Sequence, residues 1–102
     1  MYAVIFIAER CTCDARYDAM AAELRAIAVE KYGCLDFVSI TDGEREITIS
    51  YWSDLRQIQR WKKDPLHRKA QHLGRTQWYS SYRVEVVHIC RRYEVPLGAS
   101  RS

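Results

Sequence analysis

The spacing of apolar and polar positions predicts the secondary structure of the first half of the chain. Residues 2–9 form an apolar run with hydrophobic side chains on both faces, which is typical of a strand covered on both sides. Residues 15–31 repeat apolar side chains every three or four positions and predict an amphipathic helix. Its apolar stripe consists of Tyr17, Met20, Ala21, Leu24, Ile27 and Ala28. Asp14 is placed to cap this helix, and Gly33 to end it.

A hairpin and a further helix follow. Residues 35–41 and 46–52 predict two strands on either side of Asp42-Gly43, a strong hairpin signal. Polar and apolar side chains alternate along the second of these strands. Ser53 is expected to cap a short helix over residues 54–62.

Proline and glycine mark the remaining boundaries. Pro65 is favoured in a first helical turn, so another helix is expected to begin near Asp64 and to end at Gly74. Residues 82–93 predict the last strand, and a polar tail follows.

This order of elements predicts an α+β fold, a ferredoxin-like βαββαβ sandwich with an antiparallel four-stranded sheet. Helices would cover one face of the sheet. The first and last strands are largely apolar on both sides, so a lone domain would leave an apolar face in water. We therefore expect a homodimer that packs sheet face against sheet face, burying about 800 Å² per partner.

Composition narrows the class of protein. The chain of 102 residues suits one domain, and a hydrophobic share of 48% excludes general disorder. The net charge is +3 with no basic stripe, so no nucleic-acid partner is expected. The apolar opening run is too short to span a membrane and lacks the basic start of a signal peptide, which predicts no membrane association and a cytoplasmic location.

The four cysteines do not form a recognisable motif. Cys11 and Cys13 are separated by one residue, which is not C-x-x-C spacing, and Cys34 and Cys90 lie far away. Free, reduced thiols are the expectation for the cytoplasm.

Chemistry-bearing side chains concentrate between Trp61 and Tyr82, where two Trp, two Tyr, two His, two Gln and two Arg occur. His67, near a helix start, is placed to accept or donate a proton, or else to make a local hydrogen bond. His72 follows five residues later, about 140° around a helix, so the two imidazoles do not form a metal-binding pair. No cluster has ligand spacing, and no metal site is expected.

The aromatic side chains of this segment have two interpretations. Trp61, Trp78 and Tyr82 are suited to walling a pocket for an aromatic ligand, or to forming core and dimer contacts. Gln71 and Arg75 are four residues apart and share a helical face if the helix extends that far. There they would hold a polar group of a substrate, face solvent, or contact a second subunit.

The same residues carry a resemblance to a known family. The chain opens with Met1-Tyr2 and Val4-Ile5-Phe6, continues with W-x5-H-x3-Q-x2-G-R, and closes with an aromatic-x2-Y and R-x-Y. The later positions are Trp61, His67, Gln71, Gly74-Arg75, Tyr79, Tyr82 and Arg91-Arg92-Tyr93. In this layout the sequence resembles the antibiotic biosynthesis monooxygenase family of dimeric α+β barrel proteins. The resemblance covers residues 1–94 as one domain and leaves 95–102 as a flexible tail.

The resemblance implies a homodimer with one pocket per subunit between sheet and helices. It implies a cofactor-independent monooxygenase acting on a small aromatic compound, with His67 as catalytic base. Substrate contacts would come from Trp61, Gln71, Arg75, Trp78 and Tyr82.

Two alternatives remain open: a heme-binding or heme-degrading enzyme, and a dimer that binds a small ligand without catalysis. The heme-degrading branch uses an Asn on the first strand, a Trp and a His. Trp61 matches the Trp, but Phe6 or Ile7 stands in place of the Asn, so that set is incomplete.

Overall fold

The protein folds into one sheet and one layer of helices. The structure, a computed structural model, describes residues 1–11 and 15–98. Its elements are β1 (Tyr2–Arg10), α1 (Ala15–Glu30), β2 (Asp36–Asp42), β3 (Arg45–Trp52), α2 (Leu55–Lys63), α3 (Pro65–Leu73), the π-helical turn η1 (Gly74–Trp78) and β4 (Tyr79–His88).

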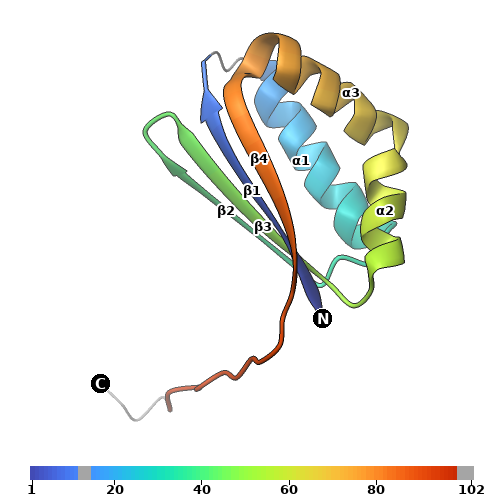
Figure 1. Cartoon of the computed structure of the whole chain (residues 1–102), viewed down its shortest axis with the longest axis vertical. Coiled ribbons are helices and arrows are strands. Elements are labelled where there is room, and N and C mark those ends of the chain that lie inside the picture. The colour runs from blue at the N-terminus through green and yellow to red at the C-terminus, as the bar shows by residue number, and fades with distance from the viewer. Residues whose placement is uncertain (12–14, 99–102) are drawn as a thin grey trace.

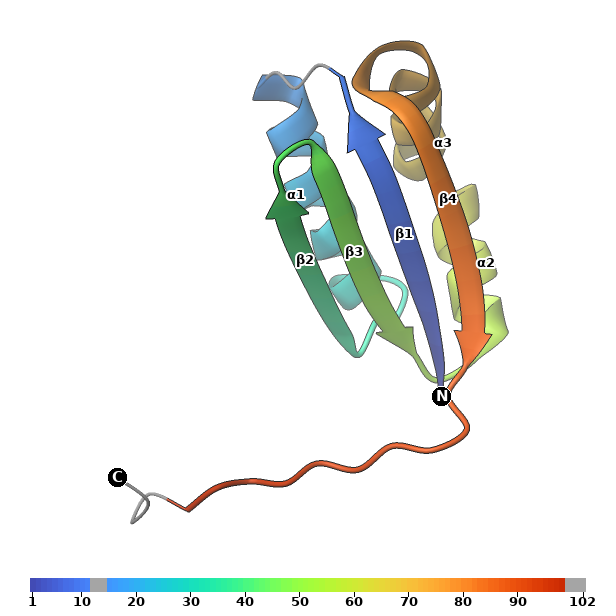
Figure 2. The same ribbon diagram turned by 60° about the vertical axis from the view of Figure 1, so that its left-hand side comes forward.

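The sheet is antiparallel with strand order β2-β3-β1-β4, and all helices lie on one of its faces (Figure 1). Figure 2 turns the sheet towards the viewer, and the helices then lie behind it. This confirms the predicted ferredoxin-like arrangement. The strand register decides which side chains meet the helices. Val4 belongs to the core with the α2 residue Ile58, so Phe6 and Ala8 also face the helices.

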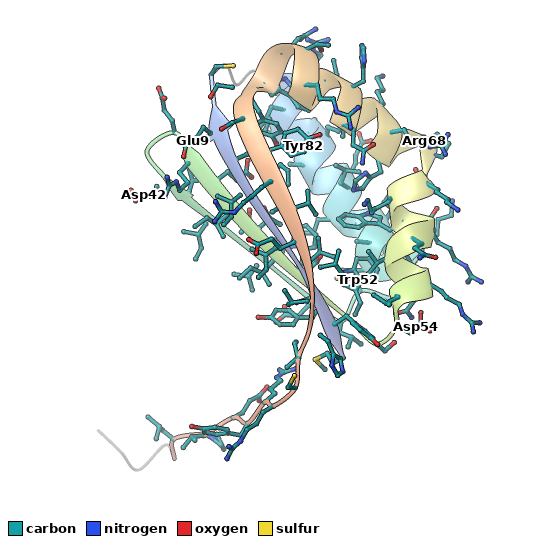
Figure 3. The ribbon with its side chains drawn as sticks, in the orientation of Figure 1. Glu9, Asp42, Trp52, Asp54, Arg68 and Tyr82 are labelled. Atoms are coloured by element: carbon teal, nitrogen blue, oxygen red, sulfur yellow. The ribbon has the colours of Figure 1, made fainter. Side chains whose placement is uncertain are left out.

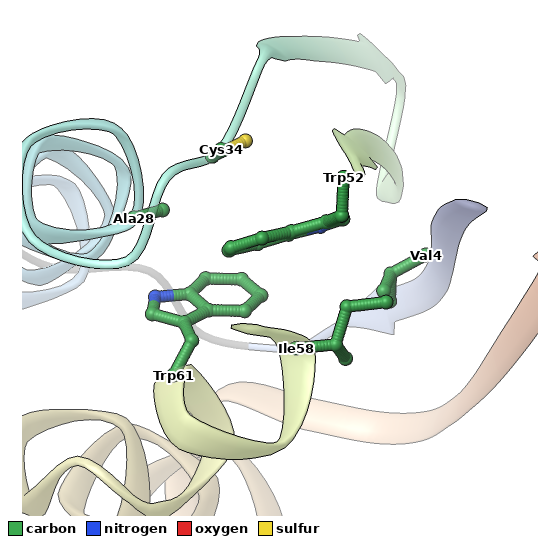
Figure 4. Packing of buried hydrophobic residues seen from close by; sticks show 6 residues of the cluster. All are labelled: Val4, Ala28, Cys34, Trp52, Ile58 and Trp61. Atoms are coloured by element: carbon green, nitrogen blue, oxygen red, sulfur yellow. The ribbon is translucent and has the colours of Figure 1, made fainter. Parts of the chain in front are cut away.

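Two buried clusters hold the helices to the sheet. The Trp52 cluster comprises Val4, Ala28, Cys34, Trp52, Ile58 and Trp61 (Figure 4). The Trp78 cluster comprises Tyr17, Met20, Leu73 and Trp78. Leu24 packs against both clusters, whereas Ala21, predicted in the same stripe, is exposed. Figure 3 shows Trp52 between the sheet and the helices, and Arg68 on the outer side of α3.

Asp54, and not Ser53, caps α2. The Asp54 carboxylate accepts hydrogen bonds from the backbone N–H of Arg56 and of Gln57. The Gln57 side chain in turn accepts from the Asp54 N–H, which completes a capping box. The prediction was wrong by one residue because both Ser and Asp are good caps, and only Asp54 has the matching glutamine three positions later.

The last strand is displaced from its prediction. It begins at Tyr79, which pairs with Arg10, and ends at His88, which pairs with Tyr2. Beyond that point one more backbone hydrogen bond forms, from the N–H of Ile89 to the carbonyl of Met1 at 3.0 Å, and residues 89–93 do not form strand. Arg92 still contacts the sheet, since its guanidinium carbon lies 5.8 Å from the centre of the Tyr51 ring, and the chain beyond it runs away from both layers (Figure 1).

Three glycines have different roles. Gly33 and Gly43 adopt φ of +81° and +61°, which confirms the predicted helix stop and hairpin turn. Gly74 has helical φ, and the chain continues into η1 instead of stopping. A Cβ at Gly74 would lie 2.9 Å from the Tyr79 ring, so close packing requires this glycine. The expected cap Asp14 and Cys13 lie outside the described residues.

The face of the sheet opposite the helices is apolar in the middle of β1, β2 and β3, whereas β4 turns Arg83 and Glu85 to it. Ile5 lies opposite Ile49, which in turn lies opposite Val38. A hollow of about 400 Å³ lies on this face, and its lining includes those three side chains. In the described part of the chain, no helix is long and apolar enough to cross a membrane.

Candidate functional site

The covered face of the sheet is incompletely filled along its middle row. In this row Ser39, Thr48, Phe6 and Val84 lie side by side across the four strands. Phe6 and Thr48 lie on central strands but are only half-buried, and Val84 is 43% exposed. On β1 the neighbouring positions of this face are closed, since Val4 and Ala8 are 7% and 1% exposed. Solvent therefore reaches the helix-facing side of the sheet between the two core clusters.

The interior of the sheet is polar on β3. Its alternation places Glu46, Thr48 and Ser50 towards the helices, and Ile47 and Ile49 towards the open face. Ser50 accepts a hydrogen bond of 2.9 Å from the indole N–H of Trp52. A strand that turns its polar side inward and its apolar side outward indicates two interaction surfaces, an internal polar one and an external apolar one.

His67 and Trp61 form one candidate pair. Their ring centroids are 4.5 Å apart with an interplanar angle of 78°, an edge-to-face contact. Trp61 is held in turn by Trp52, at 5.2 Å, and by a hydrogen bond from its indole N–H to the carbonyl of Leu24. The His67 Nδ1 atom is buried and has no hydrogen-bond partner. The structure thus presents an oriented imidazole with one unused polar atom.

Asp64 fixes the helix that carries His67. Its side chain accepts from the backbone N–H of Leu66 at 2.9 Å and from the hydroxyl of Tyr32 at 2.6 Å. Lys31 lies 3.5 Å from the same carboxylate. The Tyr32 hydrogen bond, above all, holds the pKa of Asp64 below its usual value. Pro65 occupies the first turn, as predicted.

Burial controls the protonation of His67. Burial above all, together with the positive charge of Lys62, lowers the pKa of this imidazole from 6.5 to about 4. His67 is therefore neutral at pH 7, with a lone pair that can accept a proton, but it is a weak base in the free protein.

The other predicted residues do not all join this pair. Arg75, in η1, donates a hydrogen bond of 3.0 Å from its Nε atom to the Tyr82 hydroxyl at an exposed position. Tyr82 also contacts Phe6, with ring centroids 5.6 Å apart, and so borders the middle row. Gln71 is half-buried, and η1 interrupts the helical face that it was expected to share with Arg75. Trp78 is 3% exposed in the other core cluster.

Two polar residues near the hairpin were missed by sequence reasoning. Glu46 is buried at 9% exposure, and burial raises the pKa of its carboxyl. Arg10 lies at the end of β1 with a buried, unpartnered Nε atom. The only signal in the sequence was the polar–apolar alternation of residues 46–50, which does not tell which set faces inward.

The remaining candidates for ligand binding are weaker. His72 and His88 are exposed. In the ranges that the structure describes, no group of three His, Cys, Asp or Glu residues is arranged to hold a metal ion. Cys11 and Cys90 are exposed free thiols and Cys34 is a buried one. On β1, Phe6 faces the helices and Ile7 faces the open side of the sheet, and neither position carries an Asn.

Comparisons with known proteins place the chain in a family. No model of a known protein family matches the sequence. The chain is 34% identical over 92 residues to the uncharacterized protein YqjZ of Bacillus subtilis, covering 89% of this chain and 81% of YqjZ.

Among solved structures, the fold is similar to that of SnoaB, a cofactor-independent oxygenase from Streptomyces nogalater. That match has a TM-score of 0.73 at 12% identity and covers 94% of this chain and 97% of SnoaB. Rv0793 from Mycobacterium tuberculosis matches with a TM-score of 0.78 at 10% identity, covering 91% and 98%. A "putative antibiotic biosynthesis monooxygenase" from Deinococcus radiodurans matches with a TM-score of 0.64 at 15% identity, covering 94% and 99%. The chain therefore belongs to the family of YqjZ and has the antibiotic-biosynthesis-monooxygenase fold.

Proposed function

We propose that this protein is a cofactor-independent monooxygenase that oxidises a small, acidic hydroxyaromatic compound between its sheet and its helices. Two observations carry the proposal: the half-open middle row of the sheet, and the half-buried imidazole of His67, whose Nδ1 atom is buried and unpartnered. The shared fold with SnoaB, a cofactor-independent oxygenase, supports the same class of reaction. The fold alone does not decide the chemistry, because one fold hosts many activities.

In the proposed reaction, His67 accepts the hydroxyl proton of the substrate. The resulting electron-rich anion reduces O2, which adds to a ring carbon as a hydroperoxide. Cleavage of the O–O bond with loss of the proton on that carbon leaves a new carbonyl and releases water. One oxygen atom enters the product, the other leaves as water, and the substrate supplies all the electrons.

The low pKa of His67 restricts the substrate. An ordinary phenol has a pKa of about 10. Transfer of its proton to an imidazole of pKa about 4 is uphill by roughly 8 kcal/mol before the two ions attract each other. The site therefore suits a substrate whose hydroxyl is acidified by conjugation and whose anion stays beside the imidazolium. Trp61 would hold the ring, and Tyr82 with Arg75 would border the entrance along β4.

The remaining predicted contacts are assigned to the same site. Gln71, half-buried on α3, would bind a polar group of the substrate, and Trp78, in the other core cluster, would contact the far end of the substrate. We assign no metal or other cofactor to the reaction.

Oxygen consumption tests this proposal. Purified protein is mixed with 1-naphthol in air-saturated buffer, and uptake of O2, formation of 1,4-naphthoquinone and incorporation of ¹⁸O are followed. His67→Ala and the size-conserving His67→Gln should lower kcat/KM by about 100-fold or more, the range for loss of a general base. His72→Ala is the matched control, because His72 is an exposed imidazole on the same helix. Full activity in both His67 variants would contradict the assignment.

Binding without O2 uptake would instead support a dimer that sequesters an aromatic ligand. Hemin titration tests the third possibility, a heme-binding or heme-degrading enzyme. A saturable 1:1 Soret shift that is lost in His67→Ala would support heme binding at this site.

We also propose that two copies associate through the open face of the sheet. Val38 and Ile40 on this face are 38% and 58% exposed. Contact of these apolar side chains with water is unfavourable, and association of two copies would remove it. The domain is assigned to residues 1–94, and residues 95–102 are assigned to a flexible tail.

A further inference from the structure

A second group of unpartnered polar atoms lies at the hairpin end of the sheet. Arg10 Nε, Glu46 Oε2 and Trp78 Nε1 are all buried, and none has a hydrogen-bond partner. They belong neither to the His67–Trp61 contact nor to the Arg75–Tyr82 hydrogen bond.

The strand register places Arg10 and Glu46 on the same side of the sheet. Glu46 lies opposite Ala8, and the backbone N–H of Arg10 donates to the carbonyl of Glu44 at 2.7 Å. The two charged side chains are therefore diagonal neighbours facing the helices, beside the small side chain of Ala8. Within the described chain they form no ion pair with each other. The Arg10 Nη2 atom donates instead to the carbonyl of Gly43 at 3.2 Å.

Tyr17 joins Trp78 to this group. The Arg10 guanidinium carbon lies 5.8 Å from the centre of the Tyr17 ring, and the Trp78 ring lies 5.2 Å from it in an edge-to-face contact. Tyr79, which pairs with Arg10, contacts Phe6 at 5.5 Å. An aromatic path therefore connects this cluster to the half-open middle row of the sheet.

Three unpartnered buried atoms at one end of the sheet are unusual for a folded protein. Most buried polar atoms are hydrogen-bonded, and an unsatisfied one is destabilising. Burial raises the pKa of Glu46, and the Arg10 charge partly opposes that change. A bound ligand that hydrogen-bonds to all three atoms would explain why none of them has a partner within the protein.

We propose that Arg10, Glu46 and Trp78 form a second polar subsite that binds a hydroxyl group of the aromatic ligand. A hydroxyl has one O–H donor and two acceptor lone pairs. The subsite offers the complement, with two N–H donors from Arg10 and Trp78 and one carboxylate acceptor from Glu46. This inference rests on the binding space of the proposed function but not on oxygenation.

Calorimetric titration under argon with 1-naphthol and 1-methoxynaphthalene tests the subsite. The two probes share a ring system, and only the first has an O–H donor. Wild-type protein should bind 1-naphthol about ten-fold more tightly or better, the value of one hydrogen bond to a charged group. Glu46→Leu and Trp78→Phe should reduce this preference to less than three-fold. The matched control is Glu44→Gln, which neutralises an exposed carboxylate two residues away. Circular dichroism establishes that each variant is folded.

His67→Phe separates the two sites, since it removes the other group able to bind a hydroxyl. A preference that survives in His67→Phe and disappears in Glu46→Leu supports the subsite. A preference lost only in His67→Phe overturns it, as does a wild-type preference below three-fold or no saturable binding of 1-naphthol up to about 1 mM. Because no O2 is present, the subsite can stand even if the oxygen-uptake experiment refutes the proposed reaction.

Discussion

The depressed pKa of His67 predicts a specific acid sensitivity of the fold. Burial lowers this pKa from 6.5 to about 4, whereas the unfolded chain keeps the ordinary value. Above pH 6.5 the imidazole is neutral in both states and has no effect on stability. Between pH 6.5 and about 4 the unfolded state binds a proton that the folded state does not, so stability falls as the pH falls. Below about pH 4 both states are protonated and the loss stops growing.

The size of this effect follows from the pKa difference. Each pKa unit corresponds to about 1.36 kcal/mol, so the full contribution of His67 is about 3 kcal/mol, and at pH 5 it is about 2 kcal/mol. A domain with a total stability of about 5–15 kcal/mol would lose a measurable fraction of it.

His67→Gln removes the titrating group and leaves the protein less sensitive to acid over this range. Urea unfolding of wild type and variant at pH 7.5, 6.5, 5.5 and 4.5 measures the difference, because titration of the carboxyl groups is common to both proteins. The wild type should lose stability relative to His67→Gln by about 2 kcal/mol between pH 7.5 and 5, while the exposed control His72→Gln should follow the wild type. A difference that stays constant with pH, or an NMR titration of His67 centred near pH 6.5, would refute the reasoning.

Three further predictions address the interface, the interior and the α3 cap. Ile49→Arg, in the centre of the open face, should convert the proposed dimer to monomer in sedimentation velocity. Val29→Arg, at an exposed apolar site on α1, should leave it dimeric. Glu46→Gln should raise the thermal midpoint at pH 7, because the raised pKa of Glu46 means that its ionised form destabilises the folded protein. This gain in thermal midpoint should vanish below about pH 4, where the Glu46 carboxyl is protonated in both the folded and the unfolded protein. Asp64→Ala should lower the thermal midpoint by several degrees through loss of the Leu66 cap and the Tyr32 hydrogen bond, whereas Tyr32→Phe should lower it less; equal effects would contradict the capping role.

Local sequence patterns predicted most elements because their signals are short-range. The helix of residues 15–31 and the hairpin at Asp42-Gly43 depend on spacing and on backbone preferences that act within a few residues. The predicted ends of elements were less accurate where pairing with another strand sets the end. The final strand ends at His88, where its pairing with β1 ends at Tyr2, and nothing in residues 89–93 themselves carries that information.

Within the candidate site, the sequence indicated the right segment but not its arrangement. It placed His67 close after Trp61, and the structure brings the two rings into contact. It did not separate Trp78 from that pair, because a π-helical turn begins at Gly74 and redirects the chain. For the same reason, Gln71 and Arg75 do not lie on one face of a continuous α-helix, as the sequence had predicted.

The sequence by itself determined the order of strands and helices, the hairpin and the presence of an apolar surface beyond what one core can bury. Only the tertiary structure decided which side of each strand faces the helices. Alternation along residues 46–50 is compatible with either orientation, since a side-chain period of two has no preferred direction. Packing of Val4 and Trp52 against α1 and α2 fixed it and turned Glu46 and Thr48 inward and Ile47 and Ile49 outward. That choice produces both the polar interior and the apolar open face, and it depends on contacts between residues far apart in the chain.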